Sequence, residues 1–316
     1  MENKSAYAIK HISHDIVMNS SSGGAFTALS DLILDLNGAV FGACYDSKRQ
    51  NVFHQKALKK QERDKMRGSK YIWSEIGRNV YEDLASEAVS EKWILFTGTP
   101  CQVQSAKTYL HAKGVPTEKV IFSDLICHGT PEPRLWKDYV AYFNKKYGCK
   151  IERINFKDKR DCWKRPQSFA YCGEREISIA DYTDLFYSQC ILREGCYKCK
   201  FASTQRVGDI TLGDCWGIEK NMPDFYDHFG VSIVLVNTEK GRRIFEQIQK
   251  NVEWRSVDLK DYLQHNLVKP TAPSPQRSAF IRDYNRFGIR FVLFKYSKHR
   301  LYGKIRHKIA YLKNKH

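Results

Sequence analysis

Apolar residues along the chain form short continuous runs and helically spaced sets, a mixture that predicts both strands and helices. The apolar runs of strand length are 38–45, 93–97, 120–126, 168–172 and 230–237. The helically spaced sets are 25–36, a stretch ending near residue 89, 101–110, 134–147 and 239–248. Two strand–turn–helix units follow one another between residues 93 and 147, which favours a parallel sheet.

The sequence therefore predicts an α/β to α+β fold: a mixed sheet with flanking helices, a cysteine-rich cofactor site and a helical, basic C-terminal extension. The main domain is expected to span 1–268. The proline-containing run 269–275 is interpreted as a linker or extended arm that opens the extension 269–316. Apolar residues at helical intervals within the extension are Phe287, Phe291, Phe294, Leu301, Ile305, Ile309 and Leu312.

Lysines and arginines surround these apolar positions, so the extension can act in two ways. A basic amphipathic helix can lie on an anionic membrane surface. It can also cover the protein's own core with one face while water solvates the other, which we favour. The net charge is +17, and residues 281–316 hold eleven Lys and Arg against the single acid Asp283. Because the charge belongs largely to this tail, it does not argue for nucleic-acid binding by the whole chain.

Composition narrows the class of protein further. With 42% hydrophobic and 13% aromatic residues, the 316-residue chain is globular rather than disordered. It contains neither a run of about 18 apolar residues nor the apolar stretch of a signal peptide. We therefore expect a cytoplasmic protein, with peripheral membrane contact through the basic tail as an alternative. In that compartment ten cysteines are expected to be free thiols or ligands rather than disulfides.

Four of the cysteines are candidate metal ligands. Cys196 and Cys199 are three residues apart and can turn onto one metal, but they need two more ligands. Cys101 and Cys127 each follow a predicted strand, and the carboxyl ends of strands are where α/β sheets build their sites. Cys101 also begins a predicted helix, where free amides stabilise a thiolate. Four thiolates suit tetrahedral zinc or a 4Fe-4S cluster, and spacing leaves both open. Cysteines without paired spacing are treated as non-ligands: Cys149, Cys162, Cys172 and Cys190.

A second candidate site is the small-residue loop Ser21, Ser22, Gly23 and Gly24, which leads into the helical pattern 25–36. A serine here is expected to cap the helix. The same backbone amides can seat a phosphate or another anion. Lys70 follows a glycine and a serine, which would present its ammonium on a turn as part of the site. The alternative is an ordinary lysine solvated by water. The basic run 157–166 can meet an acidic ligand, although solvation by water is the more common outcome.

Seven motifs occur in an order that resembles a known family. They are Ser-Ser-Ser-Gly-Gly-Ala-Phe (20–26), Gly-Ser-Lys-Tyr (68–71), Gly-Thr-Pro-Cys-Gln (98–102), Asp-Leu-Ile-Cys-His-Gly-Thr-Pro (124–131), Cys-Tyr-Lys-Cys-Lys (196–200), Gly-Asp-Ile-Thr-Leu-Gly-Asp-Cys-Trp-Gly (208–217) and Gly-Val-Ser-Ile-Val-Leu-Val-Asn-Thr (230–238). Over about residues 18–250 the chain resembles the beta-subunit family of coenzyme F-420 hydrogenases and dehydrogenases.

The resemblance implies an oxidoreductase in which a flavin, usually FAD, lies next to a 4Fe-4S cluster and electrons pass between the cluster and an organic acceptor such as coenzyme F-420. By this resemblance the cluster ligands are Cys101, Cys127, Cys196 and Cys199. The flavin-site residues are Ser21, Ser22, Gly23, Gly24 and Lys70. The domain 1–268 is then the flavin and iron–sulfur domain.

Two departures from the family pattern shape further expectations. Many members begin with a ferredoxin module, which is not present ahead of residue 20, so a separate ferredoxin-like protein is expected to donate electrons. Cys215 stands where the family often has an aromatic residue and is not counted as a ligand. Some relatives accompany surface-polysaccharide genes, which leaves the acceptor open. The alternative function is a non-catalytic zinc- or cluster-stabilised protein whose basic tail binds a membrane or an acidic polymer. No nucleic-acid motif is found.

Overall fold

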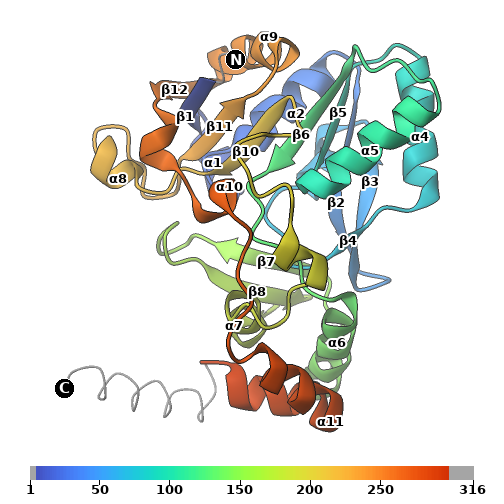
Figure 1. The fold of residues 1–316 in the computed structure, drawn as a ribbon, viewed down its shortest axis with the longest axis vertical. Helices are drawn as coiled ribbons and strands as arrows, with labels where there is room; N and C mark the ends of the chain where they lie inside the picture. The colour runs from blue at the N-terminus through green and yellow to red at the C-terminus, as the bar shows by residue number, and fades with distance from the viewer. Residues whose placement is uncertain (1–4, 299–316) are drawn as a thin grey trace.

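The computed structural model describes residues 5–298, which form one large and one small β-sheet with their covering helices (Figure 1). The large sheet has nine strands. Their spatial order is β12 (Val252–Val257), β1 (Ser5–His11), β11 (Ser232–Val236), β10 (Ile210–Asp214), β6 (Val120–Leu125), β5 (Ile94–Gly98), β2 (Ala39–Asp46), β3 (Asn51–Ala57) and β4 (Ser74–Glu75). The centre, β10–β6–β5–β2, is parallel, whereas β1, β11 and β12 pair antiparallel.

Helices cover both faces of the large sheet because its central strands are apolar on both sides. In β5, Leu95 packs into a core with α2 (Ala25–Asp35) and α9 (Glu239–Ile248). Its neighbours Ile94 and Phe96 point the other way, into a core with α4 (Arg78–Val89) and α5 (Pro100–Ala112). This alternation is the period-two geometry of a strand.

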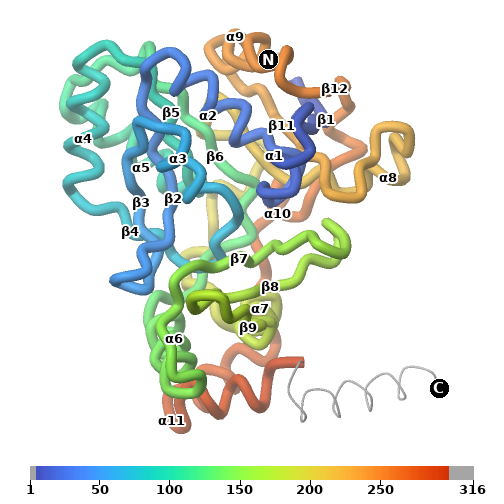
Figure 2. Tube along the Cα trace, turned by 180° about the vertical axis from the view of Figure 1, so that it is seen from behind, coloured from blue at the N-terminus to red at the C-terminus, as the bar shows by residue number. Residues whose placement is uncertain are grey.

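The small lobe lies below the carboxyl ends of the central strands (Figures 1 and 2). Its three strands are β7 (Arg153–Asp158), β8 (Gln167–Cys172) and β9 (Arg175–Ser178). They pack with α6 (Pro133–Tyr147), α7 (Ala180–Tyr187) and α11 (Arg277–Tyr296) around an aromatic core that includes Trp136, Tyr139 and Tyr182. The other short elements are α1 (His14–Met18), α3 (Lys60–Asp64), η1 (Glu194–Lys198), α8 (Ile218–Asn221), η2 (Gln249–Asn251), η3 (Leu259–Tyr262) and α10 (His265–Val268).

The predicted mixed sheet with flanking helices is confirmed, and β5 and β6 are parallel neighbours as the two strand–turn–helix units predicted. The predicted serine cap is wrong. The N-cap of α2 is Gly24, whose φ of 92° lies in the left-handed region, where a serine would be strained. The default of a solvated basic run is wrong for Lys157 and Lys159, which are 7% and 2% exposed.

The C-terminal extension covers the core of the small lobe through α11, as favoured, but Gly288 divides α11 into two helical segments, so the expected apolar positions Phe287 and Phe291 do not share one helix face. Phe280, Val292 and Leu293 on this helix are buried. The run 269–275 has neither helix nor strand, and the division at residue 268 stays a prediction. The extension's last expected apolar positions, Leu301, Ile305, Ile309 and Leu312, lie outside the described residues. Within residues 5–298, none of the helices has the length and apolar character needed to span a bilayer.

Candidate functional site

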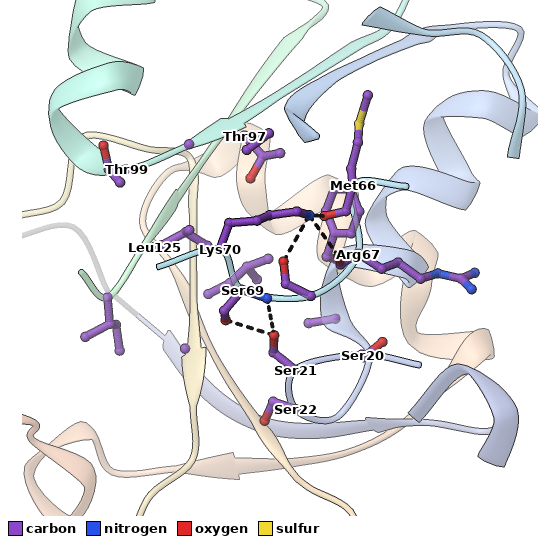
Figure 3. A pocket seen from close by; sticks show the side chains of 18 of the residues that line it. Ser20, Ser21, Ser22, Met66, Arg67, Ser69, Lys70, Thr97, Thr99 and Leu125 are labelled. Atoms are coloured by element: carbon purple, nitrogen blue, oxygen red, sulfur yellow. Dashed lines mark hydrogen bonds between the residues drawn. The ribbon is translucent and has the colours of Figure 1, made fainter. Parts of the chain in front are cut away.

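A cavity of about 260 Å³ lies at the carboxyl edge of the central strands, and we call it the serine-loop cavity (Figure 3). Its walls come from the ends of β5, β6 and β10, from the loop 20–26 and from the loop 66–70. The expected flavin-site residues Ser21, Ser22, Gly24 and Lys70 therefore line one cavity. Its volume is close to the lower end of small-molecule pockets, about 300–1,000 Å³.

The serine loop is fixed by bonds to strands far away in sequence. The Ser22 hydroxyl donates to the Val231 carbonyl at 2.7 Å. The Gly23 amide donates to the Ser232 hydroxyl at 2.9 Å, and the Gly23 carbonyl accepts from the His11 amide at 2.7 Å. The loop thus lies against β1 and β11, and the first amides of α2, which have no acceptor within the helix, come at its end.

Gly23 is required for this close approach. A Cβ at this position would lie 2.3 Å from the Ile9 carbonyl oxygen and 2.7 Å from the Ser232 nitrogen. Both are backbone atoms of the large sheet, so neither can move aside as a side chain would. Gly23, which the sequence suggests as part of an anion-binding loop, is therefore needed for this loop to pack on the sheet.

Lys70 brings a positive charge to the cavity but directs it at its own loop (Figure 3). Its ammonium donates to the carbonyls of Met66 at 2.6 Å, Arg67 at 2.8 Å and Gly68 at 3.1 Å. Burial lowers the pKa of Lys70 to about 8. No carboxylate pairs with it among residues 5–298, so the wall keeps an uncompensated positive charge below that pH.

Lys157 and Lys159 support the cavity from the small lobe. The Lys159 ammonium donates to the carbonyls of Val17 and, at 3.0 Å, of Ser22. Burial, helped by the neighbouring Lys157 charge, lowers the pKa of Lys159 to about 7. Lys157 pairs with Asp214, which lines the cavity. The basic run thus holds the serine loop and neutralises an acid at the cavity wall.

His54 is a site residue that the sequence pattern did not single out. Its Nε2 lies 3.0 Å from the Thr97 carbonyl and its Nδ1 2.7 Å from the Ser74 hydroxyl. A carbonyl can only accept, so Nε2 carries the proton and Nδ1 accepts from Ser74. Burial lowers the pKa of His54 to about 4, which keeps the ring neutral at physiological pH. The only feature of the sequence that could have pointed to His54 is its inward-facing position in the alternating pattern of strand β3.

A second cavity of about 860 Å³, which we call the Cys101 cavity, lies on the other side of His54 and Gln102. These two side chains line both cavities. Gln102 is fixed in this wall because its amide nitrogen donates to the Ser74 carbonyl at 2.8 Å and its oxygen accepts from the Thr99 amide at 3.0 Å. Cys101 is exposed and faces the second cavity.

The four candidate cysteines come from three segments that meet beside the serine-loop cavity. Cys101 lies in the first turn of α5, and Cys127 follows the end of β6. Cys196 lies in η1, with Cys199 directly after it. Thr130 joins the two sites, because it lines the serine-loop cavity and its amide donates to the Cys196 sulfur at 3.5 Å.

The cysteines are close enough to affect one another's protonation. Burial raises the pKa of Cys127 to about 12, while the Gly129 amide lowers it. The thiols of Cys101, Cys196 and Cys199 all raise it further through repulsion between thiolates. Burial also raises the pKa of Cys199, whereas the amides of Phe201 and Ala202 lower it by donating to the sulfur. A cation that binds here would relieve this repulsion.

The spacing of the thiols bears on which metal group fits. Thiolates around one zinc ion at about 2.3 Å would lie about 3.8 Å apart. Among residues 5–298, no three His, Cys, Asp or Glu side chains are close enough to hold a single metal ion. An iron–sulfur cluster has inorganic atoms at its centre and holds its four thiolates further apart. Within the described residues the cysteine group therefore does not form a single-ion site as it stands.

Cysteines outside this group have other surroundings. Cys215 is fully buried in a core with Trp163 and Ile218, and burial raises its pKa to about 12. Cys190 is likewise buried, and Cys172 and Cys149 hydrogen bond to each other in the small lobe. The largest influences on the pKa of Cys127 include none of these four.

Comparison with known proteins identifies one matching family model. Residues 91–261 match the model for the C terminus of the beta subunit of coenzyme F420 hydrogenase/dehydrogenase. This stretch includes all four candidate cysteines. No functionally curated protein matches the chain.

A solved structure shares the fold. A chain of the xenon-derivatised F420-reducing [NiFe] hydrogenase complex from Methanosarcina barkeri superposes with a TM-score of 0.54 at 16% sequence identity. The superposition covers 90% of this chain and 88% of that chain. At this identity the likeness concerns the fold, and it extends well beyond the family match.

Proposed function

The chain belongs to the coenzyme F420 hydrogenase/dehydrogenase beta-subunit family, and from this we propose that it is a flavin- and iron–sulfur-dependent oxidoreductase. The observation that carries the proposal is the meeting of four cysteines from three segments directly beside the serine-loop cavity. A cysteine site that adjoins an organic-ligand pocket is the arrangement that electron transfer between two cofactors requires.

The donor set supports a 4Fe-4S cluster held by Cys101, Cys127, Cys196 and Cys199. Backbone amides already point at three of the sulfurs: those of Gly129 at Cys127, Thr130 at Cys196, and Phe201 and Ala202 at Cys199. Hydrogen bonds to the sulfurs are one of the means by which proteins set a cluster's reduction potential. They also compensate the negative charge of the thiolates.

The serine-loop cavity supports a flavin, with FAD as the specific form proposed. Ser21, Ser22 and Gly24 line the cavity at the N-terminus of α2, whose first amides have no acceptor within the helix, and this suits a pyrophosphate, while Gly23 holds the loop on the sheet. Lys70 supplies positive charge, and it could turn to a bound anion by giving up one of its three carbonyl acceptors.

When bound, the two groups would supply single-electron transfer at the cluster and two-electron exchange with an organic acceptor at the flavin. The chain's own residues would hold these groups apart and exclude water. His54, neutral and fixed at both nitrogens, gives the wall near Thr97 a defined hydrogen-bonding pattern without adding charge. Coenzyme F-420 or another organic molecule, which could belong to surface-polysaccharide metabolism, is the proposed acceptor.

We also propose a separate ferredoxin-like protein as the electron donor. The similar solved chain belongs to a multi-subunit hydrogenase complex. In the present chain Cys101 is exposed beside a large cavity, so the cysteine site is accessible to a partner. Electrons would enter from the partner on the exposed side of Cys101. They would leave to the organic acceptor in the serine-loop cavity.

The flavin part of the proposal can be tested by releasing the ligand. Denaturing the purified protein should free FAD, identified by fluorescence before and after phosphodiesterase treatment. A chain that neither retains flavin nor binds added FAD in the anaerobic, iron-loaded state would refute this part. FMN in place of FAD would revise only the form of the flavin.

A second candidate activity is favoured by exposed side chains on the two helical segments of α11, which Gly288 separates. Ile281, Phe287 and Phe294 on this helix are 38%, 50% and 50% exposed. Exposed arginines lie among them at positions 282, 286 and 290. Gly288 (φ 73°, ψ −174°) divides α11 into two helical segments, which lie side by side because Asp283 pairs with Lys295 at 2.6 Å. Arginines interleaved with exposed apolar side chains suit the surface of an anionic membrane, to which these segments would bind while their buried side chains pack on the small lobe.

Binding to vesicles tests this surface. The wild-type chain is expected to co-sediment with phosphatidylserine-containing vesicles and not with neutral ones. The double change Arg286→Gln and Phe287→Ala should weaken binding about tenfold or more, because it removes one charge and one inserted ring. Arg243→Gln, a similarly exposed arginine on α9, is the matched control. Equal binding by both variants, or none by the wild type, would rule out the surface.

A further inference from the structure

Arg206 and Asp124 form an ion pair in the interior, next to the cysteine site. The two side chains are 1% and 0% exposed, and Arg206 Nη2 lies 3.0 Å from Asp124 Oδ1. Asp124 is in β6, three residues before Cys127. Arg206 follows Cys199 by seven residues. The pair therefore joins the strand that leads to one candidate ligand with the loop that leaves two others.

The remaining donors of Arg206 extend this connection. Its Nη1 donates to the carbonyls of Phe201 at 3.0 Å and Ser203 at 3.1 Å, both in the loop after Cys199. Its Nη2 also donates to the Leu125 carbonyl at 2.9 Å, at the end of β6. One planar guanidinium thus fixes the distance between the cysteine loop and the strand end.

The carboxylate does not need Arg206 for its own hydrogen bonds. Asp124 Oδ1 accepts from the Thr211 hydroxyl at 2.6 Å, and Oδ2 from the amides of Val207 and Gly208 at 3.2 and 3.1 Å. Burying an arginine costs desolvation energy that an apolar residue would avoid. What the arginine adds is the set of bonds to the loop and to Leu125.

We propose that Arg206, anchored by Asp124, is a positioning residue that holds the Cys196–Cys199 loop against the end of β6 and so forms the cysteine site before iron binds. The part of this inference that concerns cluster retention rests on the proposed function. The part that concerns the loop can be measured in the metal-free chain.

Arg206→Lys is the informative variant. Lysine keeps the charge and can still pair with Asp124, but a single ammonium cannot reach Leu125, Phe201 and Ser203 together. Arg63→Lys is the matched control. Arg63 is also 1% exposed, bonds to the Thr27 carbonyl at 3.2 Å and pairs with Asp31 at 2.6 Å, but it joins α2 to α3.

Two readouts separate the inference from a general loss of stability. In the metal-free chain, amide hydrogen exchange across 196–206 should be about tenfold faster in Arg206→Lys than in wild type, as expected for local opening. Arg63→Lys should leave this stretch unchanged. In the iron-loaded protein, loss of iron to a chelator should be about tenfold faster in Arg206→Lys alone.

Each outcome is decisive. Unchanged exchange across 196–206 in Arg206→Lys, or equal acceleration in Arg63→Lys, overturns the positioning role. Faster exchange with unchanged iron retention overturns the cluster-holding part. A wild-type chain that takes up neither iron nor sulfide refutes the proposed function, while the exchange measurement still decides whether Arg206 positions the loop.

Discussion

Cys127→Ser is expected to cause near-complete loss of iron and sulfide from the protein while the fold is retained. Cys127 is half-buried, and all three other candidate ligands are near enough to raise its pKa. A serine hydroxyl has nearly the same size but does not ionise at physiological pH, so it is a poor ligand for iron in a cluster. The measurement is the iron and acid-labile sulfide per chain after anaerobic reconstitution.

Cys162→Ser is the matched control for this prediction. Cys162 is also half-buried, and its sulfur accepts from the Lys164 amide at 3.4 Å, a bond that a serine oxygen can replace. The iron content of Cys162→Ser should equal that of the wild-type protein. Full iron in Cys127→Ser, or equal losses in both variants, would contradict the assignment of Cys127.

Gly23→Ala is expected to produce the second-largest effect, loss of flavin together with a destabilised fold. The new Cβ would meet backbone atoms of Ile9 and Ser232 at 2.3 and 2.7 Å. The loop must then move away from β1 and β11, which breaks its bonds to the His11 amide and the Ser232 hydroxyl. Overpacking of this kind costs about 1–3 kcal/mol in the free energy of unfolding.

Urea unfolding of the metal-free chain and flavin content of the loaded chain measure the two effects. Gly195→Ala provides the control, because a Cβ there meets nothing within 4 Å and its backbone is not left-handed. It should change neither quantity. Wild-type stability and flavin content in Gly23→Ala would show that the serine loop can leave the sheet without consequence.

The elements with strong local patterns could be predicted from the sequence. Strands such as β5 and β6 are apolar on both sides, and each leads through a turn into an amphipathic helix, so their parallel pairing follows from neighbouring segments alone. The places of Cys101 and Cys127 follow from the same logic, because each comes directly after a strand. That the Cys196–Cys199 loop meets them depends on contacts between segments far apart in the chain, for which the signals were a two-thiol pair that needs two more ligands and the family resemblance.

Residues that act through long-range contacts could not be found in this way. His54 is one inward-facing position in a strand and becomes notable only because Ser74 and Thr97 lie on either side of its ring. Lys159 belongs to a basic run that normally faces water, and its burial depends on carbonyls from Val17 and Ser22. The N-cap of α2 was missed because the conformation at Gly24 is set by docking of the loop on the sheet.

The central claim is tested most directly by counting inorganic sulfide in the anaerobically purified chain. Zinc and iron–sulfur sites can share the same four cysteines, but only a cluster contains acid-labile sulfide. About four sulfides and four irons per chain, in a brown protein without stoichiometric zinc, are expected for a 4Fe-4S site. A colourless protein that holds one zinc and no sulfide would contradict the proposed oxidoreductase.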